Sequence, residues 1–439
     1  MKQQTKFKET EIGEIPEDWE IITLKNACQK IGSGITPRGA EKVYKDKGVT
    51  LIRSQNVYNH FFSSSGLVFI DDTIAEEMKN VELKEKDLLL NITGDSVARC
   101  CLVPKEYLPA RVNQHVSIIR TDHKILNPKF LQSYLTSHKM QDFMLSLAQS
   151  GGTRNALTKS MIESFIIPKP NIDEQQAIAK ILSSLDAKIE LNQKMNKTLE
   201  VIGQALFKHW FIDFEFPNEK GKPYKSSGGE KVDSELGEIP LGWKLGRLGD
   251  ITSLIRDGTH NPPKRILGGV PLITGINVKD NFVRHDNITY ITEENYMGIH
   301  KKYQPEENDL LITKIGTLGK VAIIRKNDLP IAIHCNVAII RNNSNVSPQY
   351  LFWLFKSDIF QNQFHLKKKQ TVQEFINLEQ LSELDCIIPN KKMISSFDLL
   401  ITPVFKKISL NNLEIHGLIQ IRDSLLPKLI SGKIRVKLK

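Results

Sequence analysis

Mostly apolar residues recur at alternating steps of four and three along two stretches of the chain, 178–210 and 397–429. In the first stretch these positions read Ile, Leu, Leu, Ile, Asn, Asn, Leu, Gly, Leu and Trp; in the second they read Phe, Ile, Val, Ile, Asn, Ile, Leu, Arg, Leu and Leu. A mean step of 3.5 residues is typical of the seam of a coiled coil. Because two matched stripes in one chain can bury each other, we predict two long helices that pair along them. Two unrelated core helices are the alternative.

The predicted seam carries one polar residue at the same place in each helix, Asn192 and Asn411. A buried Asn fixes the register of a coiled coil at some cost in stability, whereas at a frayed seam it faces water. Arg422 stands where the first helix has Gly203, so we expect the second helix to face a partner or to bend outward there. The seam positions are Ile178, Leu182, Leu185, Ile189, Asn192, Leu199 and Leu206 in the first helix and Ile401, Val404, Ile408, Asn411, Ile415, Leu418 and Leu425 in the second.

Capping residues and prolines mark the expected ends of these helices. Asp173 and Gln176 form a D-x-x-Q pair, which is typical of a helix start. Pro403 and Pro427 fall inside the second pattern. Since proline removes a backbone donor and clashes with the preceding turn, we expect a kink or a new start at Pro403, capped by Thr402, and an end or kink at Pro427.

The whole chain repeats itself once. The phrase at 13–19, "GEIPEDW", returns at 237–243 as "GEIPLGW", and "DLLLNITG" from Asp87 returns from Asp309 as "DLLITKIG". The order of further repeated phrases, such as "HVSIIR" and "NVAIIR", is preserved along the chain. A conserved order at a nearly constant offset predicts a tandem duplication.

Each half has the same predicted plan: a β-rich part, a helix, a short strand ending in "IIP" and the long helix. We therefore predict an α/β (α+β) fold in which two globular domains with mostly antiparallel sheets are related by a pseudo-twofold axis and joined by an antiparallel coiled coil. The β-rich segments are β-branched and bounded by turn residues. The predicted strands are 49–57, 66–70, 87–93, 98–104 and 115–121 in the first half and 270–278, 288–292, 309–315, 320–326 and 336–341 in the second, with helices near 128–148 and 348–365.

The chain is basic, with 60 Lys and Arg against 50 Asp and Glu, which gives a formal net charge of +10. This balance favours a polyanionic partner. The sequence has neither an apolar run long enough to span a membrane nor an apolar signal segment at its start. Its five cysteines form no CxxC pair and are typical of reduced, buried thiols. We expect a cytoplasmic protein.

The motifs that look catalytic lack residues that catalysis needs. "HNPPK" from His260 contains the Asn-Pro-Pro core of adenine-N6 methyltransferases, but Lys264 stands where an aromatic residue would stack the base. "GTLGK" from Gly316 is too short for a phosphate-binding loop and lacks the following Ser or Thr. No spacing typical of a metal site occurs, so we predict that the chain is not an enzyme and binds no metal.

Several predicted loops combine the residue types that contact DNA. Arg reads guanine, Asn and Gln read adenine, and Lys suits phosphates, although for each single residue a solvated surface loop is the alternative. The two halves differ most in these loops, so we expect an asymmetric target in two parts. The candidates are Arg38, Arg53, Gln55, Asn56, Gln114, His115, Arg154 and Asn155 in the first half and Arg256, Thr259, His260, Lys264, Arg265, Asn277, Lys367, Lys368, Lys369 and Gln370 in the second.

Five phrases are characteristic of one protein family: "GEIPEDW", "DLLLNITGD", "IIPKPNIDEQQAIAKILSSLDAKIELN", "GQALFKHWF" and "IRDSLLPKLISGKIRV". On these phrases the chain resembles, over residues 12–436, the specificity subunit of type I restriction–modification enzymes. The resemblance implies target recognition domains at 1–170 and 236–390. It also implies conserved helical regions at 171–215 and 391–439. A linker at 216–235 would join the first helical region to the second recognition domain.

The resemblance also implies a function and partners. The chain would read a two-part site in double-stranded DNA, with the gap set by the helices, and would have no catalysis or cofactor of its own. It would join two modification (methyltransferase) subunits, which use S-adenosylmethionine, and restriction subunits, which use ATP and Mg²⁺. The alternative is a coiled-coil assembly adaptor that reads no bases.

Overall fold

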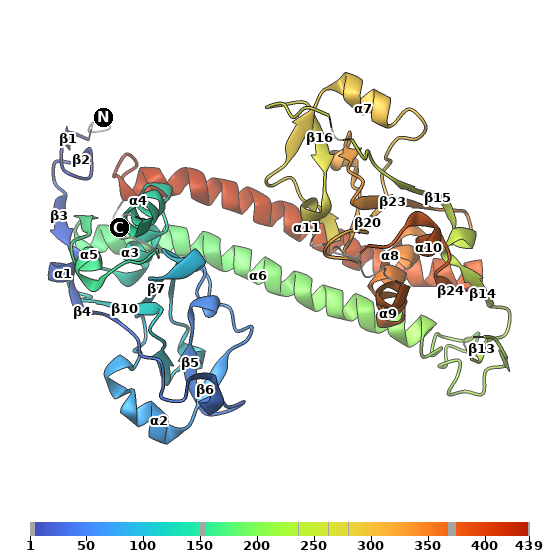
Figure 1. The fold of residues 1–439 in the computed structure, drawn as a ribbon, viewed down its shortest axis with the longest axis horizontal. Helices are drawn as coiled ribbons and strands as arrows, with labels where there is room; N and C mark the ends of the chain where they lie inside the picture. The colour runs from blue at the N-terminus through green and yellow to red at the C-terminus, as the bar shows by residue number, and fades with distance from the viewer. Residues whose placement is uncertain are drawn as a thin grey trace. The chain divides into compact units, whose positions relative to one another are not determined.

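The computed structural model describes residues 5–149, 155–235, 237–261, 263–279, 281–367 and 375–437. The chain divides into two compact units (Figure 1). Unit 1 consists of Met1–Leu191 and Glu414–Lys439, and unit 2 consists of Asn192–Leu413. Within the described ranges, no helix has the length and apolar character needed to cross a membrane.

Two sheets form the β part of unit 1. One has the strand order β4-β10-β7-β8 and is antiparallel throughout; the other has the order β6-β5-β9, with β5 and β9 parallel. The bounds are β4 (Cys28–Ser33), β10 (Val116–Thr121), β7 (Leu88–Asn91), β8 (Cys100–Leu102), β6 (Val68–Ile70), β5 (Val49–Ile52) and β9 (Ala110–Val112).

Short helices gather where the long helix α6 begins in unit 1 (Figure 1). The predicted helix near 128–148 is in fact two helices, α3 (Pro128–Leu135) and α4 (His138–Gln149). The short strand that carries the phrase "IIP", β11 (Ile166–Lys169), pairs with β3 (Glu20–Thr23). The remaining short elements are β1 (Phe7–Lys8), β2 (Ile15–Pro16), α1 (Leu24–Ala27), α2 (Asp72–Glu77) and α5 (Lys159–Glu163).

Unit 2 repeats this plan with a larger sheet. Its sheets have the orders β15-β23-β20-β21-β18-β17, β19-β16-β22 and β14-β24, and the pairs β18/β21 and β16/β22 are parallel. The strands are β14 (Lys244–Arg247), β15 (Thr252–Asp257), β16 (Val270–Ile273), β17 (Val278–Lys279), β18 (Asn281–Val283), β19 (Thr289–Ile291), β20 (Leu310–Thr313), β21 (Val321–Ile323), β22 (Ala332–Ile333), β23 (Val337–Asn342) and β24 (Asp385–Ile388). The helices are α7 (Glu293–Ile299), α8 (Pro348–Lys356), α9 (Asp358–Lys367) and α10 (Leu378–Ser382).

The prediction of mostly antiparallel sheets is confirmed, since three of the strand pairs named above are parallel and the others are antiparallel. The predicted helix near 348–365 is divided, because Ser357 is extended between α8 and α9. The predicted linker begins with a small aromatic cluster: Phe216 stacks on Trp243 and Tyr224, with ring centroids 4.9 and 4.6 Å apart. It also contributes β12 (Lys231–Val232), which pairs with β13 (Ile239–Pro240).

A buried ion pair holds the same two strands together in both units. In unit 1, Arg120 donates from Nε and Nη2 to the two carboxylate oxygens of Asp87, at 2.8 and 2.7 Å. In unit 2, Arg341 donates to Asp309 in the same way, at 2.7 and 2.8 Å. The hydrogen bonds that each arginine donates to its carboxylate raise the pKa of the arginine above its usual value. The repeated phrases of the sequence therefore encode a repeated structural frame.

Both long helices, α6 (Ile172–Phe211) and α11 (Lys391–Ile430), contribute one half to each unit. In unit 1, Lys188 lies 3.4 Å from Glu414 and Asp186 lies 3.3 Å from Arg422. Since the residue number falls on one helix as it rises on the other, the two segments run antiparallel. Arg422 is 15% exposed and forms this ion pair within unit 1, so the expectation that it bends outward is wrong.

In unit 2 the helices are also antiparallel. The rings of Phe207 and Phe397 lie 6.0 Å apart, and Asn411 donates to Asn196 at 2.8 Å, while Asn196 donates to Asn412 at 2.7 Å. Asn192 and Asn411 are almost completely buried, so they do not face water. All the seam residues named above are buried or half-buried.

The starts of both helices differ from the prediction. The side chain of Asn171, rather than Asp173 and Gln176, caps α6 by accepting from the backbone N–H of Glu174 at 2.9 Å. Helix α11 begins at Lys391 and continues through Pro403 and Pro427, so the predicted new start at Thr402 is wrong. Both prolines are exposed, and so are Leu399 and Asp423, the residues whose carbonyl groups lose a donor there.

Candidate nucleic-acid interface

In unit 1 the turns that follow β5 and β7 meet the turn that precedes β10. The backbone N–H of Ile92 donates to the carbonyl of His115 at 3.0 Å, and the N–H of Gly94 donates to the carbonyl of Asn155 at 3.2 Å. The Thr93 hydroxyl lies 2.7 Å from Nδ1 of His115, which orients the imidazole ring. Segments that are far apart in the sequence therefore present their side chains together.

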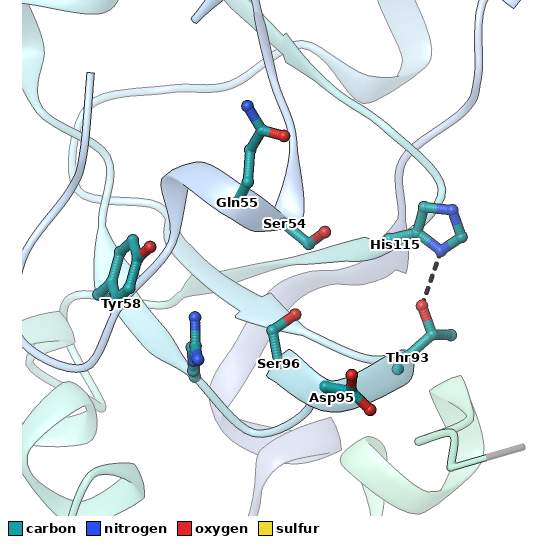
Figure 2. Close-up of a pocket in the computed structure, with 9 residues that line it drawn as sticks. Ser54, Gln55, Tyr58, Thr93, Asp95, Ser96 and His115 are labelled. Atoms are coloured by element: carbon teal, nitrogen blue, oxygen red, sulfur yellow. Dashed lines mark hydrogen bonds between the residues drawn. The ribbon is translucent and has the colours of Figure 1, made fainter. Parts of the chain in front are cut away.

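These turns surround a hollow of about 450 Å³, which we call the unit 1 hollow. Figure 2 shows that its polar side chains come from separate turns and that Thr93 and His115 face each other across a hydrogen bond. The open hollow is large enough for a flat polar group such as a nucleobase. Its lining residues are Ser54, Gln55, Tyr58, Thr93, Gly94, Asp95, Ser96, Arg99 and His115.

Two of the candidate residues fold their own loop. Asn56 is completely buried; its Oδ1 accepts from the backbone N–H of Arg53 at 3.0 Å, and its Nδ2 donates to the carbonyl of Ser63 at 2.9 Å. In unit 2, Asn277 is 1% exposed and makes the equivalent bonds to Thr274 and Arg284, both at 3.1 Å. These amides hold a turn in place and are not offered to a ligand.

The other described candidates of unit 1 are exposed or half-buried. Arg53 is half-buried, since it donates to the carbonyl of Gly66 at 2.6 Å and its guanidinium lies 5.3 Å from the Tyr44 ring centroid. His115 is half-buried in the hollow, whereas Arg38, Gln55, Gln114 and Asn155 are exposed. Arg154 lies outside the described residues.

In unit 2 the corresponding turns are closed by a charged pair. Lys314, at the position of Ile92 in the repeat, is 7% exposed and lies 2.9 Å from the carboxylate of Asp257. The N–H of Cys335 donates to the carbonyl of Thr259 at 3.1 Å, so the turn after β15 meets the turn before β23. A buried lysine and its carboxylate partner therefore lie among these turns.

The basic candidates of unit 2 lie around this cluster. Arg256, His260, Lys264 and Arg265 are exposed, and Thr259 is half-buried; His260 lies 3.2 Å from Asp257. Lys367 donates to the carbonyl of Glu383 at 2.8 Å. Lys368, Lys369 and Gln370 lie outside the described residues.

Sequence reasoning missed seven residues of the unit 1 hollow: Ser54, Tyr58, Thr93, Gly94, Asp95, Ser96 and Arg99. A signal for four of them was present, because the two halves diverge directly after the shared strand, from "NITGDSVARC" in one to "TKIGTLGKVA" in the other. Within the described part of the chain, no group of His, Cys, Asp or Glu is placed to hold a metal ion. The site offers hydrogen-bonding groups and charge.

Comparison with known proteins gives consistent relatives. A model of the type I restriction modification DNA specificity domain matches residues 16–201 and 240–414. The type I restriction enzyme MjaIX specificity subunit of Methanocaldococcus jannaschii is 28% identical over 439 residues, which cover 99% of this chain and 98% of the relative. The HindI specificity subunit of Haemophilus influenzae is 25% identical and covers 95% of this chain and 100% of the relative. The crystal structure of a type I S subunit from M. genitalium superposes with a TM-score of 0.58 at 15% identity, over 94% of this chain and 96% of the other, so the fold is shared.

Proposed function

Since the chain belongs to the family of type I restriction modification DNA specificity domains, we propose that each of its units reads one half of a two-part DNA target. The relatives are specificity subunits, which are a non-catalytic part of their enzyme complexes, and this chain has the same role. The observation that carries the proposal is a repeated frame with different side chains at its strand ends.

The difference between the units predicts an asymmetric target. Unit 1 presents an open polar hollow, whereas in unit 2 the ion pair of Lys314 and Asp257 lies among the corresponding turns. In the turn after β5 of unit 1, Gln55 corresponds to Ile276 in the turn after β16 of unit 2, and Ile276 is 70% exposed. Amides read base edges by hydrogen bonds and apolar groups favour the thymine methyl, so the two units select different bases.

Exposed cations supply affinity for the phosphate backbone. Arg38 in unit 1, and Arg256, Lys264 and Arg265 in unit 2, are exposed close to these turns in the sequence. Contacts of this kind position a protein on DNA without selecting a sequence, and they weaken as salt rises. Binding by the assembled complex should therefore be salt-sensitive, and salt-insensitive binding would favour an adaptor role.

The long helices offer a surface for protein partners. In unit 2 the apolar side chains of Leu399, Leu410 and Leu413, all on α11, are 79%, 52% and 49% exposed. Exposed apolar groups of this kind mark interaction surfaces when they gather along one element. We assign them to the modification subunits, which would supply S-adenosylmethionine, with restriction subunits adding ATP and Mg²⁺. The complex would work on DNA in the cytoplasm.

The domain boundaries stay a proposal. Residues 1–170 and 236–390 would be the target recognition domains, and 171–215 and 391–439 the helical regions that join them. This division assigns each long helix to one region. The structural units divide both helices instead, at Leu191 and Leu413.

A methylation map of genomic DNA tests the function. In cells that express this chain with its methyltransferase partner, we expect adenine methylation at one asymmetric motif with two specific parts and an unread gap. Deleting the gene for this chain alone should remove all methylation at that motif. A motif that persists after the deletion, or an uninterrupted palindrome, would show that another protein selects the target.

Shortening the helix pair tests whether it sets the gap. Residues 189–195 of α6 and 411–417 of α11 each form one heptad, so their joint removal keeps the seam in phase. Seven residues span about 10 Å of helix, which corresponds to about 3 base pairs of DNA. We expect the methylated motif to keep both specific parts and to lose about 3 base pairs of its gap. Removing residues 189–195 alone, the control, should abolish methylation, and an unchanged gap in the matched deletion would refute the role of the helices.

A further inference from the structure

The carboxylate of Asp95 and the guanidinium of Arg99 both line the unit 1 hollow, and they form no ion pair with each other. From this arrangement we infer that the hollow reads a C·G base pair, with Asp95 accepting from the cytosine N4 amine and Arg99 donating to the guanine O6 and N7. The inference rests on the proposed function and assigns residues and a base pair to one part of the target.

Arg99 is held by aromatic rings rather than by an acceptor. Its guanidinium carbon lies 4.8 Å from the ring centroid of Tyr58, and Tyr58 stacks on Phe61 with centroids 4.8 Å apart and planes 10° apart. A cation over a ring face is stabilised while its N–H groups stay free along the edge of the guanidinium plane. Among the described residues none accepts a hydrogen bond from the Arg99 side chain, so this edge is open to a ligand.

The Asp95 carboxylate is accessible to a donor on a ligand. It is exposed in the turn Gly94–Ser96, and within the described ranges no hydrogen bond or ion pair reaches its carboxylate. On a surface that binds DNA, a carboxylate repels phosphates, and the amine of a base is a group on DNA from which it can accept a hydrogen bond. Asp and Glu accept from the cytosine N4 amine in the major groove.

The two side chains together select one base pair. Guanine presents two acceptors, O6 and N7, that match the fork of an arginine, and the paired cytosine presents its amine beside them. An A·T pair offers an amine as well, but it presents only N7 of adenine and O4 of thymine, on different bases, to an arginine. The rest of the lining supports this geometry, because the Ser96 hydroxyl accepts from Asn91 at 3.1 Å and the Thr93 hydroxyl bonds with His115, which fixes the turn.

The same position in unit 2 lacks this pair of groups. The repeat places Thr317 where unit 1 has Asp95. Lys320 corresponds to Arg99, because its carbonyl accepts from the N–H of Thr313 as that of Arg99 accepts from the N–H of Asn91, at 3.0 and 2.9 Å. Lysine is a point charge without a planar fork. The C·G reading therefore belongs to one half of the target only.

Methylation maps of variant complexes test the inference. The wild-type motif should contain a C·G pair. In the Asp95→Asn variant the discrimination against other base pairs at this position should fall by about tenfold, because an amide can also donate to the wrong base. Arg99→Lys, which keeps the charge and removes the fork, should relax the same pair or its neighbour. Asp72→Asn, the control, removes an exposed acid on α2 of the same unit and should leave the base discrimination at every position of the motif unchanged.

Three results would overturn the inference. The first is a uniform fall in methylation with unchanged base discrimination at every position of the motif. The others are a loss of discrimination at an A·T pair and a loss of discrimination in both halves of the target. If Asp95→Asn fails to fold, as judged by thermal unfolding of the complex, Arg99→Lys alone decides between these results. A wild-type complex without a two-part motif would instead refute the proposed function, so the two failures can be distinguished.

Discussion

Replacing Arg341 by methionine is expected to destabilise unit 2 by about 3–5 kcal/mol, because it leaves a buried carboxylate without its cation. Asp309 is 1% exposed and receives two hydrogen bonds from Arg341, at 2.7 and 2.8 Å. The backbone N–H of Glu306 then remains as its donor, at 2.7 Å. Methionine keeps most of the aliphatic volume, so the loss is that of the charge and its hydrogen bonds.

Urea unfolding followed by tryptophan fluorescence measures this effect. Three of the four tryptophans, Trp210, Trp243 and Trp353, lie in unit 2, and Trp19 lies in unit 1, so the signal reports mainly on unit 2. The double variant Arg341→Met with Asp309→Leu should recover part of the loss, since it removes the unpaired charge. A loss below about 1 kcal/mol for the single variant would show that water reaches Asp309 and that the pair is not a buried one.

The sister pair in unit 1 provides an independent comparison. Arg120→Met leaves Asp87, also 1% exposed, in the same position. We expect a loss of similar size that appears in the fluorescence of Trp19 and leaves the unfolding of unit 2 unchanged. A single shift of both signals would mean that the two units unfold together.

The frame was predictable because its signals are local and occur twice. The heptad steps, the shared "DLL" strands and the arginine that ends each "IIR" phrase are all properties of short segments. The cap of α6 is also a local contact, since Asn171 accepts from the N–H of Glu174 three residues on. Asp173 and Gln176 have the same spacing, so the pattern alone does not decide between the two starts. Likewise, the effect of Pro403 depends on which side of the helix faces water.

The base-reading residues were harder to predict, since the same amide can either fold a turn or bind a ligand. Asn56 and Asn277 were chosen for their chemistry, although they occupy the same position in both halves. A residue that recurs in both copies serves the common frame, and here both amides close a turn. Asp95 and Arg99 differ from their counterparts in unit 2, and these unmatched positions lie in the hollow. In a duplicated protein, differences between the copies are a better guide to specificity than residue type.

Replacing Gly203 by alanine is expected to destabilise unit 2 by about 1–3 kcal/mol, although alanine is the better helix former. A Cβ atom at this position of α6 would lie 2.2 Å from Cζ2 of Trp353, which is 1% exposed. The indole cannot easily move away, because Phe405 packs edge-on against it with ring centroids 5.7 Å apart. The glycine therefore lets α8 approach the long helix, and the seam position that Arg422 fills in the other half needs no side chain here.

Gly417 provides the matched control, because it lies within α11 and a Cβ atom there would meet no described atom within 4 Å. Gly417→Ala should stabilise the protein by about 0.5–1 kcal/mol through the lower entropy of its unfolded chain. Adding Trp353→Leu to Gly203→Ala should cost less than the sum of the two single changes, since the smaller side chain makes room for the methyl group. Additive losses in this cycle, or a stabilising Gly203→Ala, would show that Trp353 does not pack on this face of α6. The opposite signs expected for two helical glycines follow from their neighbours alone.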